Sequence, residues 1–367
     1  MSMLSMSRRL RRTPFSEGVE AAGVKAYTVY NHMLLPTVFR SVEEDYHHLK
    51  SAVQLWDVSC ERQVEIRGPD AQRLVQLLTP RDLRGMLPGQ CGYMPIVDET
   101  GGMLNDPVVV KLAEDHWWIS IADSDLLYWV KGIANGYRYD VLVDEPDVSP
   151  LAVQGPLAED LLVSVFGESI RAIRFFRFAI FEFLGRNLLI ARSGYSKQGG
   201  FEIYVEGSER CMPLWNTLME AGRSMDVHAG CPNLIERIEG GLLSYGNDMT
   251  DDNTPHECGL GRFCNVETAI GCIGRDALLR VVKEGPVRQI RALSIDGDPV
   301  PPCDRHWPIR AGKQTVGRVS SAAWSPDFKT NVCMGMVMMT HWDPGTRLIV
   351  DTPAGEREAV VEERFWA

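Results

Sequence analysis

The chain has 367 residues, of which 45% are hydrophobic and 24% charged, and its formal net charge is -11. This composition is typical of a globular protein with two or three domains, and the acidic balance argues against nucleic-acid binding, which needs a basic surface. The chain has neither an apolar run of about 18 residues nor a secretory signal, so we expect a cytoplasmic protein that does not span a membrane. The nine cysteines lack metal-ligand spacing and are expected to be buried thiols, so no metal is predicted.

The first part of the chain predicts an antiparallel arrangement of strands with helices beside them. Residues 41–57 are expected to form a helix, with Ser41 as its N-cap and Glu44 completing a capping box. Residues 62–68 alternate as a strand, and a helix follows over residues 68–79. Residues 92–122 have the pattern of three strands joined by a Gly-Gly turn and a polar turn. This pattern indicates an antiparallel meander.

The segment Asn105-Asp106-Pro107 interrupts this strong strand signal. Proline inside a strand pattern indicates a bulge or an edge, and a bulge often turns a side chain toward a functional site. The alternative is a plain turn or a kink that protects an edge.

The second half of the chain predicts a helix over residues 158–167 and hairpin strands over residues 182–207 around a glycine-rich crossover. A further helix is expected to start after Pro232. From about Gly285 onward, short strand patterns are separated by turns rich in proline and glycine. This change in the sequence pattern predicts a separate small β domain.

The glycine-rich stretch "GYSKQGGFE" (194–202) does not have the order of a phosphate-binding loop, because its lysine precedes Gly199-Gly200 and a strand follows instead of a helix. In that strand, period-2 alternation predicts a core face and an opposite face. The core face carries Phe201, Ile203 and Val205, and the opposite face carries Glu202, Tyr204 and Glu206. The second face is either a solvated outer surface or part of a polar site.

The helix expected after Pro232 has an apolar stripe of Leu234, Ile235, Ile238 and Leu242. On a helical wheel Arg237 lies at its edge and Tyr245 continues its line. Gly240-Gly241 inside a helix would cost about 1 kcal/mol per residue relative to alanine. Such a pair indicates either the close approach of a ligand or backbone, or a notch for helix packing.

Several motifs occur in the order seen in one known family: "WDVSCERQVEIRGPDA", "GGMLNDPVV", "LAVQGP", "ARSGYSKQGGFEIYV", "IERIEGGLLSYGNDM" and "TPHECGLGRF". Over nearly its whole length the chain resembles the aminomethyltransferases, whose type member is the glycine-cleavage T-protein. The resemblance implies an α+β fold arranged as a three-domain cloverleaf around a central folate cavity, with a C-terminal β-barrel or jelly-roll-like domain. The implied domains are a central one of residues 1–55 with 147–250, a second of residues 56–146, and a C-terminal one of residues 285–367.

Within that family, the stretches "YTVYNHMLLP", "NDPVV", "ISIADSDLL", "SKQGG" and "CPNLIERIE" are similar to the dimethylsulfoniopropionate (DMSP) demethylases. The resemblance implies redox-neutral methyl transfer from DMSP to N5 of tetrahydrofolate, giving 5-methyltetrahydrofolate and 3-methylmercaptopropionate. The implied partners are these two small molecules, and the resemblance allows a homodimer.

The same resemblance implies roles for individual residues. Asp106 is similar to the family's acidic residue near folate N5, as proton acceptor or pterin orienter. The implied folate contacts are Glu202, Arg237, Tyr204 and Tyr245. The implied methyl-donor side comprises Tyr30, Tyr93, Tyr195 and Lys197, with Trp56 nearby. Aromatic faces suit a sulfonium cation, and a lysine suits the carboxylate at the other end of DMSP.

Two positions depart from the demethylase pattern. Tyr195 stands where those enzymes usually have tryptophan, and Gly92 stands where a bulkier aromatic residue is expected. Three alternatives therefore remain open: a demethylase of another methylated sulfonium, amine or ether; a glycine-cleavage aminomethyltransferase; and a folate-binding factor for iron–sulfur assembly. The last group carries a cysteine where this chain has Ser193–Ser196.

Overall fold

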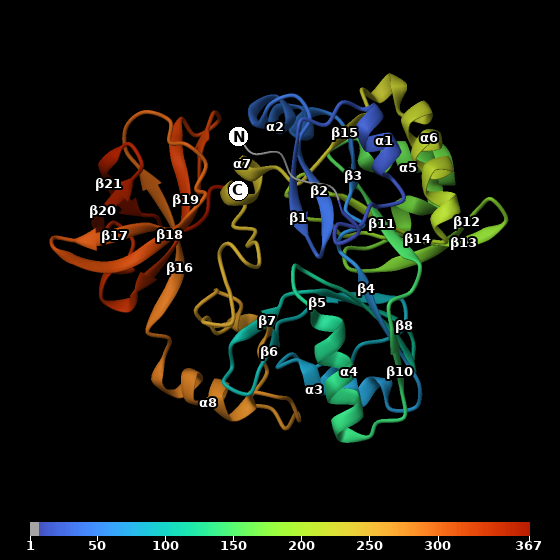
Figure 1. Ribbon diagram of the computed structural model, residues 1–367, viewed down its shortest axis with the longest axis horizontal. Coiled ribbons are helices and arrows are strands. Elements are labelled where there is room, and N and C mark those ends of the chain that lie inside the picture. Colours follow the sequence, from blue (N-terminus) through green and yellow to red (C-terminus); the bar gives the residue numbers. More distant parts are fainter. Residues whose placement is uncertain (1–6) are drawn as a thin grey trace. The chain divides into compact units, whose positions relative to one another are not determined.

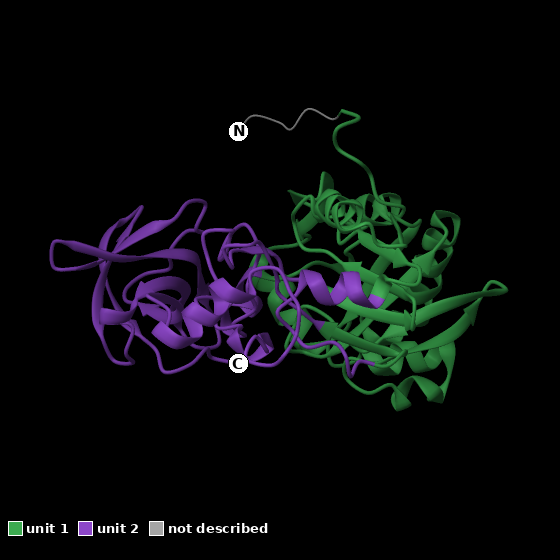
Figure 2. Ribbon diagram, turned by 90° about the horizontal axis from the view of Figure 1, so that it is seen from below, with its two compact units in different colours: residues 1–71, 87–92, 108–233 green, residues 72–86, 93–107, 234–367 purple. Residues whose placement is uncertain are grey.

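The computed structural model describes residues 7–367 (Figure 1). Contacts divide this chain into two compact units (Figure 2). The described part of the first unit comprises residues 7–71, 87–92 and 108–233, and the second comprises residues 72–86, 93–107 and 234–367. The three predicted domain boundaries stay a prediction, because this division into two units does not test them. Among the described residues, no helix combines the length and the apolar character that crossing a bilayer requires.

The first unit is built on a six-stranded sheet in the order β12-β13-β14-β11-β3-β15. Neighbouring strands are antiparallel except β15, which pairs parallel with β3. The strands are β3 (Gln54–Asp57), β11 (Val148–Gln154), β12 (Phe178–Phe183), β13 (Arg186–Ala191), β14 (Gly200–Glu206) and β15 (His228–Gly230).

Helices pack on one face of this sheet: α1 (Ser16–Ala21), α5 (Ala158–Phe166) and α6 (Cys211–Ala221). Their apolar side chains form a core with the inward-facing residues of the sheet. Phe201, Ile203 and Val205 of β14 belong to this core, as the alternation in the sequence predicted. Glu202 and Tyr204 consequently point to the opposite face of the sheet.

A five-stranded sheet in the order β10-β4-β9-β8-β5 covers that opposite face. Its strands are β4 (Gln63–Arg67), β5 (Gln90–Tyr93), β8 (Val108–Ala113), β9 (His116–Ser120) and β10 (Leu142–Asp144). Cys91, Val110 and Trp118 of this sheet form one apolar cluster with Leu189 and Tyr204 of the larger sheet. The first unit also contains α2 (Val42–Ser51), α4 (Leu126–Tyr137) and the hairpin of β1 (Ala26–Tyr30) and β2 (Met33–Val38).

The second unit contains a closed six-stranded barrel in the order β16-β19-β18-β17-β20-β21. This confirms the expected C-terminal β-barrel, while its predicted start at about Gly285 stays a prediction. The barrel strands are β16 (Arg288–Ile295), β17 (Trp307–Ala311), β18 (Gln314–Ser325), β19 (Thr330–Met338), β20 (Arg347–Thr352) and β21 (Gly355–Val361). The other elements are most of α3 (Ala71–Leu78), the paired β6 (Ile96–Val97) and β7 (Met103–Asn105), α7 (Leu234–Glu239) and α8 (Arg275–Glu284). Short 3-10 helices occur in the first unit at Glu168–Ala172, Ser208–Arg210 and Arg223–Met225, and in the second unit at Gly261–Phe263 and Met339–His341.

The helix predicted over residues 41–57 is too long. Its start is confirmed, since the Ser41 side chain accepts a hydrogen bond from the backbone N–H of Glu44. The helix ends at Ser51, and residues 54–57 form β3, which pairs with β11 on one side and β15 on the other. All four residues of β3 are buried, so two strand neighbours outweigh the local helix signal.

The helix predicted after Pro232 is also too long, because α7 ends at Glu239. The N–H of Leu242 bonds the carbonyl of Arg237, and the N–H of Gly241 bonds that of Ile238. These two bonds, with Gly241 at φ +68°, form the Schellman motif that closes a helix. The glycine pair therefore terminates the helix, and the continuous stripe through Leu242 to Tyr245 does not exist. A Cβ on Gly241 would also lie 2.6 Å from the ring of Phe365.

Candidate active site

Asp106 follows β7 directly and precedes Pro107, which lacks the N–H that a continuing strand would need. The interruption seen in the sequence is therefore a strand end and not a bulge within one strand. Such an end places the Asp106 side chain outside regular pairing, where its carboxylate depends on nearby side chains for hydrogen bonds.

The Asp106 carboxylate is held at one oxygen only. The Tyr93 hydroxyl donates to Oδ2 over 2.8 Å, whereas Oδ1 is shielded from solvent and has no hydrogen-bond partner among residues 7–367. Burial raises the pKa of Asp106 from 3.8 to about 7, while the Tyr93 hydrogen bond opposes that rise. A carboxyl group with this pKa and an unoccupied oxygen can accept or return a proton near neutral pH.

Aromatic side chains support this carboxylate within the second unit. The Tyr93 ring meets the Phe263 ring edge-on at 5.0 Å between centroids. The Tyr245 hydroxyl donates to the carbonyl of Met103 in β7 over 2.9 Å. Tyr93 and Tyr245 also pack against the apolar cluster that contains Met103. The second unit thus places the Tyr93 hydroxyl on Asp106 and the Tyr245 hydroxyl on β7, the strand that Asp106 follows. The methyl-donor role implied for Tyr93 stays a prediction.

Arg237, expected as a folate contact, is engaged in a buried network of the second unit. Its guanidinium donates to Oδ2 of Asp248 over 2.8 Å and to the hydroxyl of Ser321 over 2.6 Å. Asp248 also accepts from the hydroxyls of Ser320 and Ser321 and from the N–H of Ser244. This network ties α7 to the barrel strand β18. If Arg237 contacts the folate, it must do so while its guanidinium also bonds Asp248 and Ser321.

Glu202 is buried on the sheet face away from the helices of the first unit. Its Oε2 accepts a 2.5 Å hydrogen bond from the Ser193 hydroxyl, and the Tyr204 hydroxyl lies 3.4 Å from the same oxygen. Burial raises the pKa of Glu202, and these hydroxyls oppose the rise. A solvated outer surface is therefore the wrong interpretation for Glu202 and Tyr204, whereas Glu206 at the end of the strand is exposed. Tyr204 is 1% exposed as a whole residue, its ring packs near Trp118, and its hydroxyl is directed at Glu202.

The glycine-rich loop between β13 and β14 encloses the side chain of Gln154. A Cβ on Gly194 would lie 2.1 Å from Nε2 of Gln154, and one on Gly200 would lie 2.6 Å from the same atom. Nε2 donates to the carbonyls of Ser193 and Phe201. The glycines therefore make room for a glutamine that fastens both ends of the loop.

The other residues expected on the methyl-donor side belong to the first unit. Tyr30 is half-buried at the end of β1, Tyr195 is half-buried on the glycine-rich loop, and Lys197 is exposed on the same loop. Trp56 is fully buried, and its ring packs with Leu49, Val58 and Ala152. Trp56 therefore has no free face for a sulfonium, which corrects our expectation for that residue.

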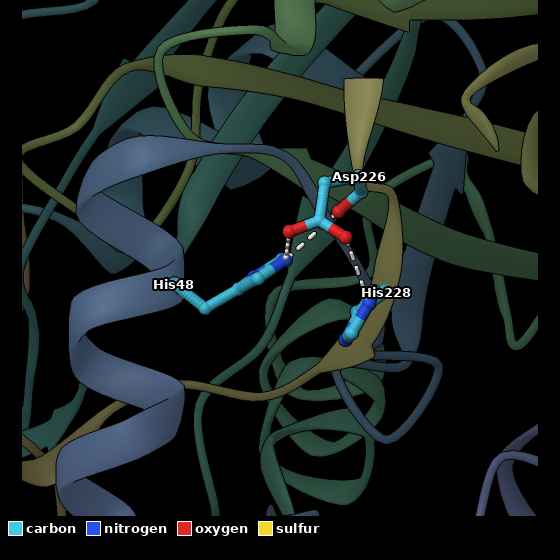
Figure 3. Close-up of side chains that lie close together, drawn as sticks. All are labelled: His48, Asp226 and His228. Atoms are coloured by element: carbon cyan, nitrogen blue, oxygen red, sulfur yellow. Dashed lines mark hydrogen bonds and ion pairs between the residues drawn. The ribbon is translucent and has the colours of Figure 1, made fainter. Parts of the chain in front are cut away.

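One group of side chains in the first unit resembles a metal site. His48 of α2 and His228 of β15 both approach Asp226, and their rings stack at 4.4 Å (Figure 3). Nε2 of His48 lies 2.8 Å from the backbone carbonyl of Asp226 and 3.5 Å from its carboxylate. Nε2 of His228 lies 3.2 Å from the other carboxylate oxygen.

The hydrogen bonds behind His48 oppose metal binding. Trp56 can only donate, so it fixes Oε1 of Gln54 as an acceptor and directs the Gln54 NH2 group to Nδ1 of His48 and the carbonyl of Asp45. Nδ1 of His48 must then accept, and Nε2 carries the hydrogen donated to Asp226. A metal on Nε2 would move that hydrogen to Nδ1, against the Gln54 NH2 group. We therefore assign His48 as a clamp between α2 and the Asp226 turn.

Known protein families match the chain over nearly its whole length. The GCVT N-terminal domain matches residues 15–268, and the glycine cleavage T-protein C-terminal barrel domain matches residues 288–366. The chain belongs to the glycine cleavage T-protein family. A solved member, the glycine cleavage system aminomethyltransferase T of Bartonella henselae, has the same fold with a TM-score of 0.87 at 24% identity, and 98% of each chain is covered. The α+β fold with a C-terminal barrel is thereby confirmed.

The chain is 61% identical over 366 residues to the dimethylsulfoniopropionate demethylase DmdA of Ruegeria pomeroyi, with 100% of both chains covered. It is 30% identical over 368 residues to the aminomethyltransferase of Lysinibacillus sphaericus, with 98% of each chain covered. The predicted resemblance to the demethylase branch is thus confirmed, and the chain is a full-length homologue of a DMSP demethylase.

Two residues of the Glu202 site were missed in the sequence, Ser193 and Gln154. Both lie inside motifs that carried the family resemblance, "ARSGYSKQGG" and "LAVQGP". Gln154 is the last residue of β11, directly before Gly155, and a polar residue at the end of an apolar strand was the available signal. Its partners lie about 40 residues away in sequence, so their contact depends on the pairing of β11 with β14.

Proposed function

We propose that the protein is a tetrahydrofolate-dependent demethylase of DMSP, producing 5-methyltetrahydrofolate and 3-methylmercaptopropionate. The observation that carries this proposal is the 61% identity to a DMSP demethylase over the full length of both chains. Asp106 and Glu202 each fit it, because a pterin offers N–H donors to carboxylate oxygens that have no partner among residues 7–367.

The reaction requires little acid–base catalysis by the protein. The methyl carbon leaves the sulfonium sulfur, which keeps the bonding electrons and becomes a neutral thioether. Tetrahydrofolate supplies N5 as the nucleophile. The chain has to hold donor and acceptor in line, with the reacting atoms about 3–3.5 Å apart, and has to receive the proton that N5 releases.

Asp106 is the proposed proton acceptor, through Oδ1. Oδ2 already accepts the Tyr93 hydrogen bond, so the unoccupied oxygen is the one that can take up a proton. Its pKa of about 7 lies near neutral pH, and a general base is most effective when its pKa is close to the pH of the reaction. This pKa favours proton acceptance over the alternative role of only orienting the pterin.

The remaining residues bind and orient. We propose that Glu202 accepts hydrogen bonds from the pterin through Oε1, and that Tyr245 and Tyr204 stabilise the surroundings of the two carboxylates. Tyr30 and Tyr195 present rings suited to the sulfonium, and Lys197 is suited to the DMSP carboxylate.

A demethylase acting on another methyl donor is the second candidate. Tyr195 supports it, because a tyrosine replaces the tryptophan usual in the demethylases and offers less ring area to a sulfonium. An aminomethyltransferase is less well supported, since the chain is 30% identical to the aminomethyltransferase of Lysinibacillus sphaericus and 61% identical to the demethylase.

The test is an assay of the purified full chain with tetrahydrofolate and a panel of methylated sulfonium, amine and ether donors. We expect 5-methyltetrahydrofolate and 3-methylmercaptopropionate to form in equal amounts from DMSP. Asp115→Asn is a matched control, because Asp115 is exposed in the turn between β8 and β9, and it should keep full activity. Product from another donor but none from DMSP would establish the second candidate instead.

A further inference from the structure

We propose that Ser193 is a positioning residue for Glu202, fixing one carboxylate oxygen so that the other is presented to the folate. This inference rests on the proposed function, in which Glu202 binds the pterin. Ser193 itself would not touch the folate.

The contacts of the Glu202 carboxylate are one-sided. Ser193 and Tyr204 both direct their hydroxyls at Oε2, over 2.5 Å and 3.4 Å. Oε1 has no hydrogen-bond partner among residues 7–367. Since an ionised carboxylate only accepts, holding Oε2 fixes the rotation of the group and leaves the lone pairs of Oε1 for ligand donors.

The Ser193 hydroxyl is held in place by the structure behind it. Ser193 is 4% exposed, and its carbonyl accepts a hydrogen bond from Nε2 of Gln154. Oε1 of Gln154 in turn accepts from the hydroxyl of Ser196, which locks the amide orientation. Gly194 permits this arrangement, because any Cβ there would collide with Gln154. The chain of contacts runs from β11 through the loop to the carboxylate of β14.

Ser193 also favours the ionised form of Glu202. Burial raises the pKa of this carboxyl group, and the Ser193 hydrogen bond is the strongest influence in the other direction. Without the hydroxyl, Glu202 would keep its proton up to a higher pH, and a protonated carboxyl group is a poorer acceptor for pterin N–H groups. Folate binding should therefore become sensitive to pH in a range where the unsubstituted protein binds well.

The test is calorimetric titration of the full chain with 5-formyltetrahydrofolate at several pH values between about 5 and 8. We expect Ser193→Ala to weaken binding by about tenfold or more and to move the acidic loss of binding to higher pH. Glu202→Gln should bind weakly at every pH. Ser208→Ala is the matched control, because it removes a hydroxyl that also bonds a carboxylate over 2.5 Å, that of Asp147 on the surface.

Four outcomes bear on the proposal. A Ser193→Ala variant with the affinity and pH profile of Ser208→Ala overturns the proposal. Weaker binding with an unmoved pH profile also overturns it, because a purely structural role would produce that result. If Ser193→Ala does not fold, Ser193→Cys keeps the volume with a weaker donor and must shift the profile in the same direction. A failure of the unsubstituted protein to bind the folate at any pH would instead contradict the proposed function.

Discussion

Asp106 and Asp248 are two carboxylates of the same unit whose surroundings differ sharply. Asp248 accepts hydrogen bonds from two serine hydroxyls, one backbone N–H and the Arg237 guanidinium. Among residues 7–367, Asp106 has one side-chain donor, the Tyr93 hydroxyl, and a shielded oxygen with no partner. A carboxylate saturated by protein donors stabilises a fold, whereas a shielded and unsaturated one costs stability, and a catalytic role is one explanation for its presence. The difference separates a structural acid from a chemical one.

Replacing Asp106 tests the chemical side of this contrast. Asp106→Asn should lower the rate of methyl transfer by about 100-fold to 10,000-fold, the usual contribution of a general base, while 5-formyltetrahydrofolate still binds. The pKa of Asp106 is raised on folding, from 3.8 to about 7, so ionising it costs stability as the pH rises through that window. Thermal unfolding should therefore show the variant gaining stability relative to the unsubstituted protein as the pH rises. Full activity in Asp106→Asn would contradict the assignment.

Replacing Arg237 tests the structural side. Arg237→Ala should lower the free energy of unfolding by about 3–5 kcal/mol, because it leaves the buried Asp248 charge without its partner. Urea unfolding measures this loss, and the double variant Arg237→Met with Asp248→Asn should recover part of it. If Arg237→Ala keeps its stability and loses only folate binding, then Arg237 is the ligand contact predicted from the sequence. The pair of Arg237 and Asp248 would then not be a structural one.

Removing the Tyr93 hydroxyl takes from Asp106 its side-chain hydrogen-bond donor and so increases its difference from Asp248. The Tyr93 hydrogen bond lowers the pKa of Asp106, so Tyr93→Phe should raise it above about 7. Since the ionised form is the proton acceptor, the rise of kcat/KM with pH should move to higher pH, with a roughly tenfold or smaller loss near neutrality. The ring contact with Phe263 is retained in this variant. A loss of rate that is equal at every pH would show that Tyr93 does not act through the pKa of Asp106.

His48 extends the comparison to a buried imidazole and has the smallest expected effect. Both of its nitrogens have partners, and burial lowers its pKa from 6.5. A lowered pKa means that the unfolded chain binds the proton more readily than the folded one. The stability from neutral His48 is therefore present above about pH 6.5, and it is lost as the pH falls from there through the lower pKa of the folded state. His48→Gln should reduce this acid-linked loss in thermal unfolding between about pH 7.5 and 5.5. His47→Gln is the control, because its side chain is exposed, and an equal effect of both variants would contradict the clamp.

Local sequence patterns predicted much of the fold and part of the site. The alternation in β14 placed Glu202 and Tyr204 on one face, and Ser41 marked the start of α2. The proline after Asp106 marked an interrupted strand pattern, and the family resemblance implied the role of Asp106. The errors came where a distant partner competed with the local signal, as in β3, or where glycine closed α7 by its left-handed conformation.

The sequence by itself determined the order of the elements, the apolar faces and the family, because periodicity and motif order are properties of neighbouring residues. Only the tertiary structure decided which acids are saturated, since the donors to Asp106, Asp248 and Glu202 come from other segments of the chain. It also decided that Trp56 is core and that the glycine-rich loop encloses Gln154. Burial and hydrogen-bond saturation depend on what packs against a side chain, and that partner is chosen by the fold.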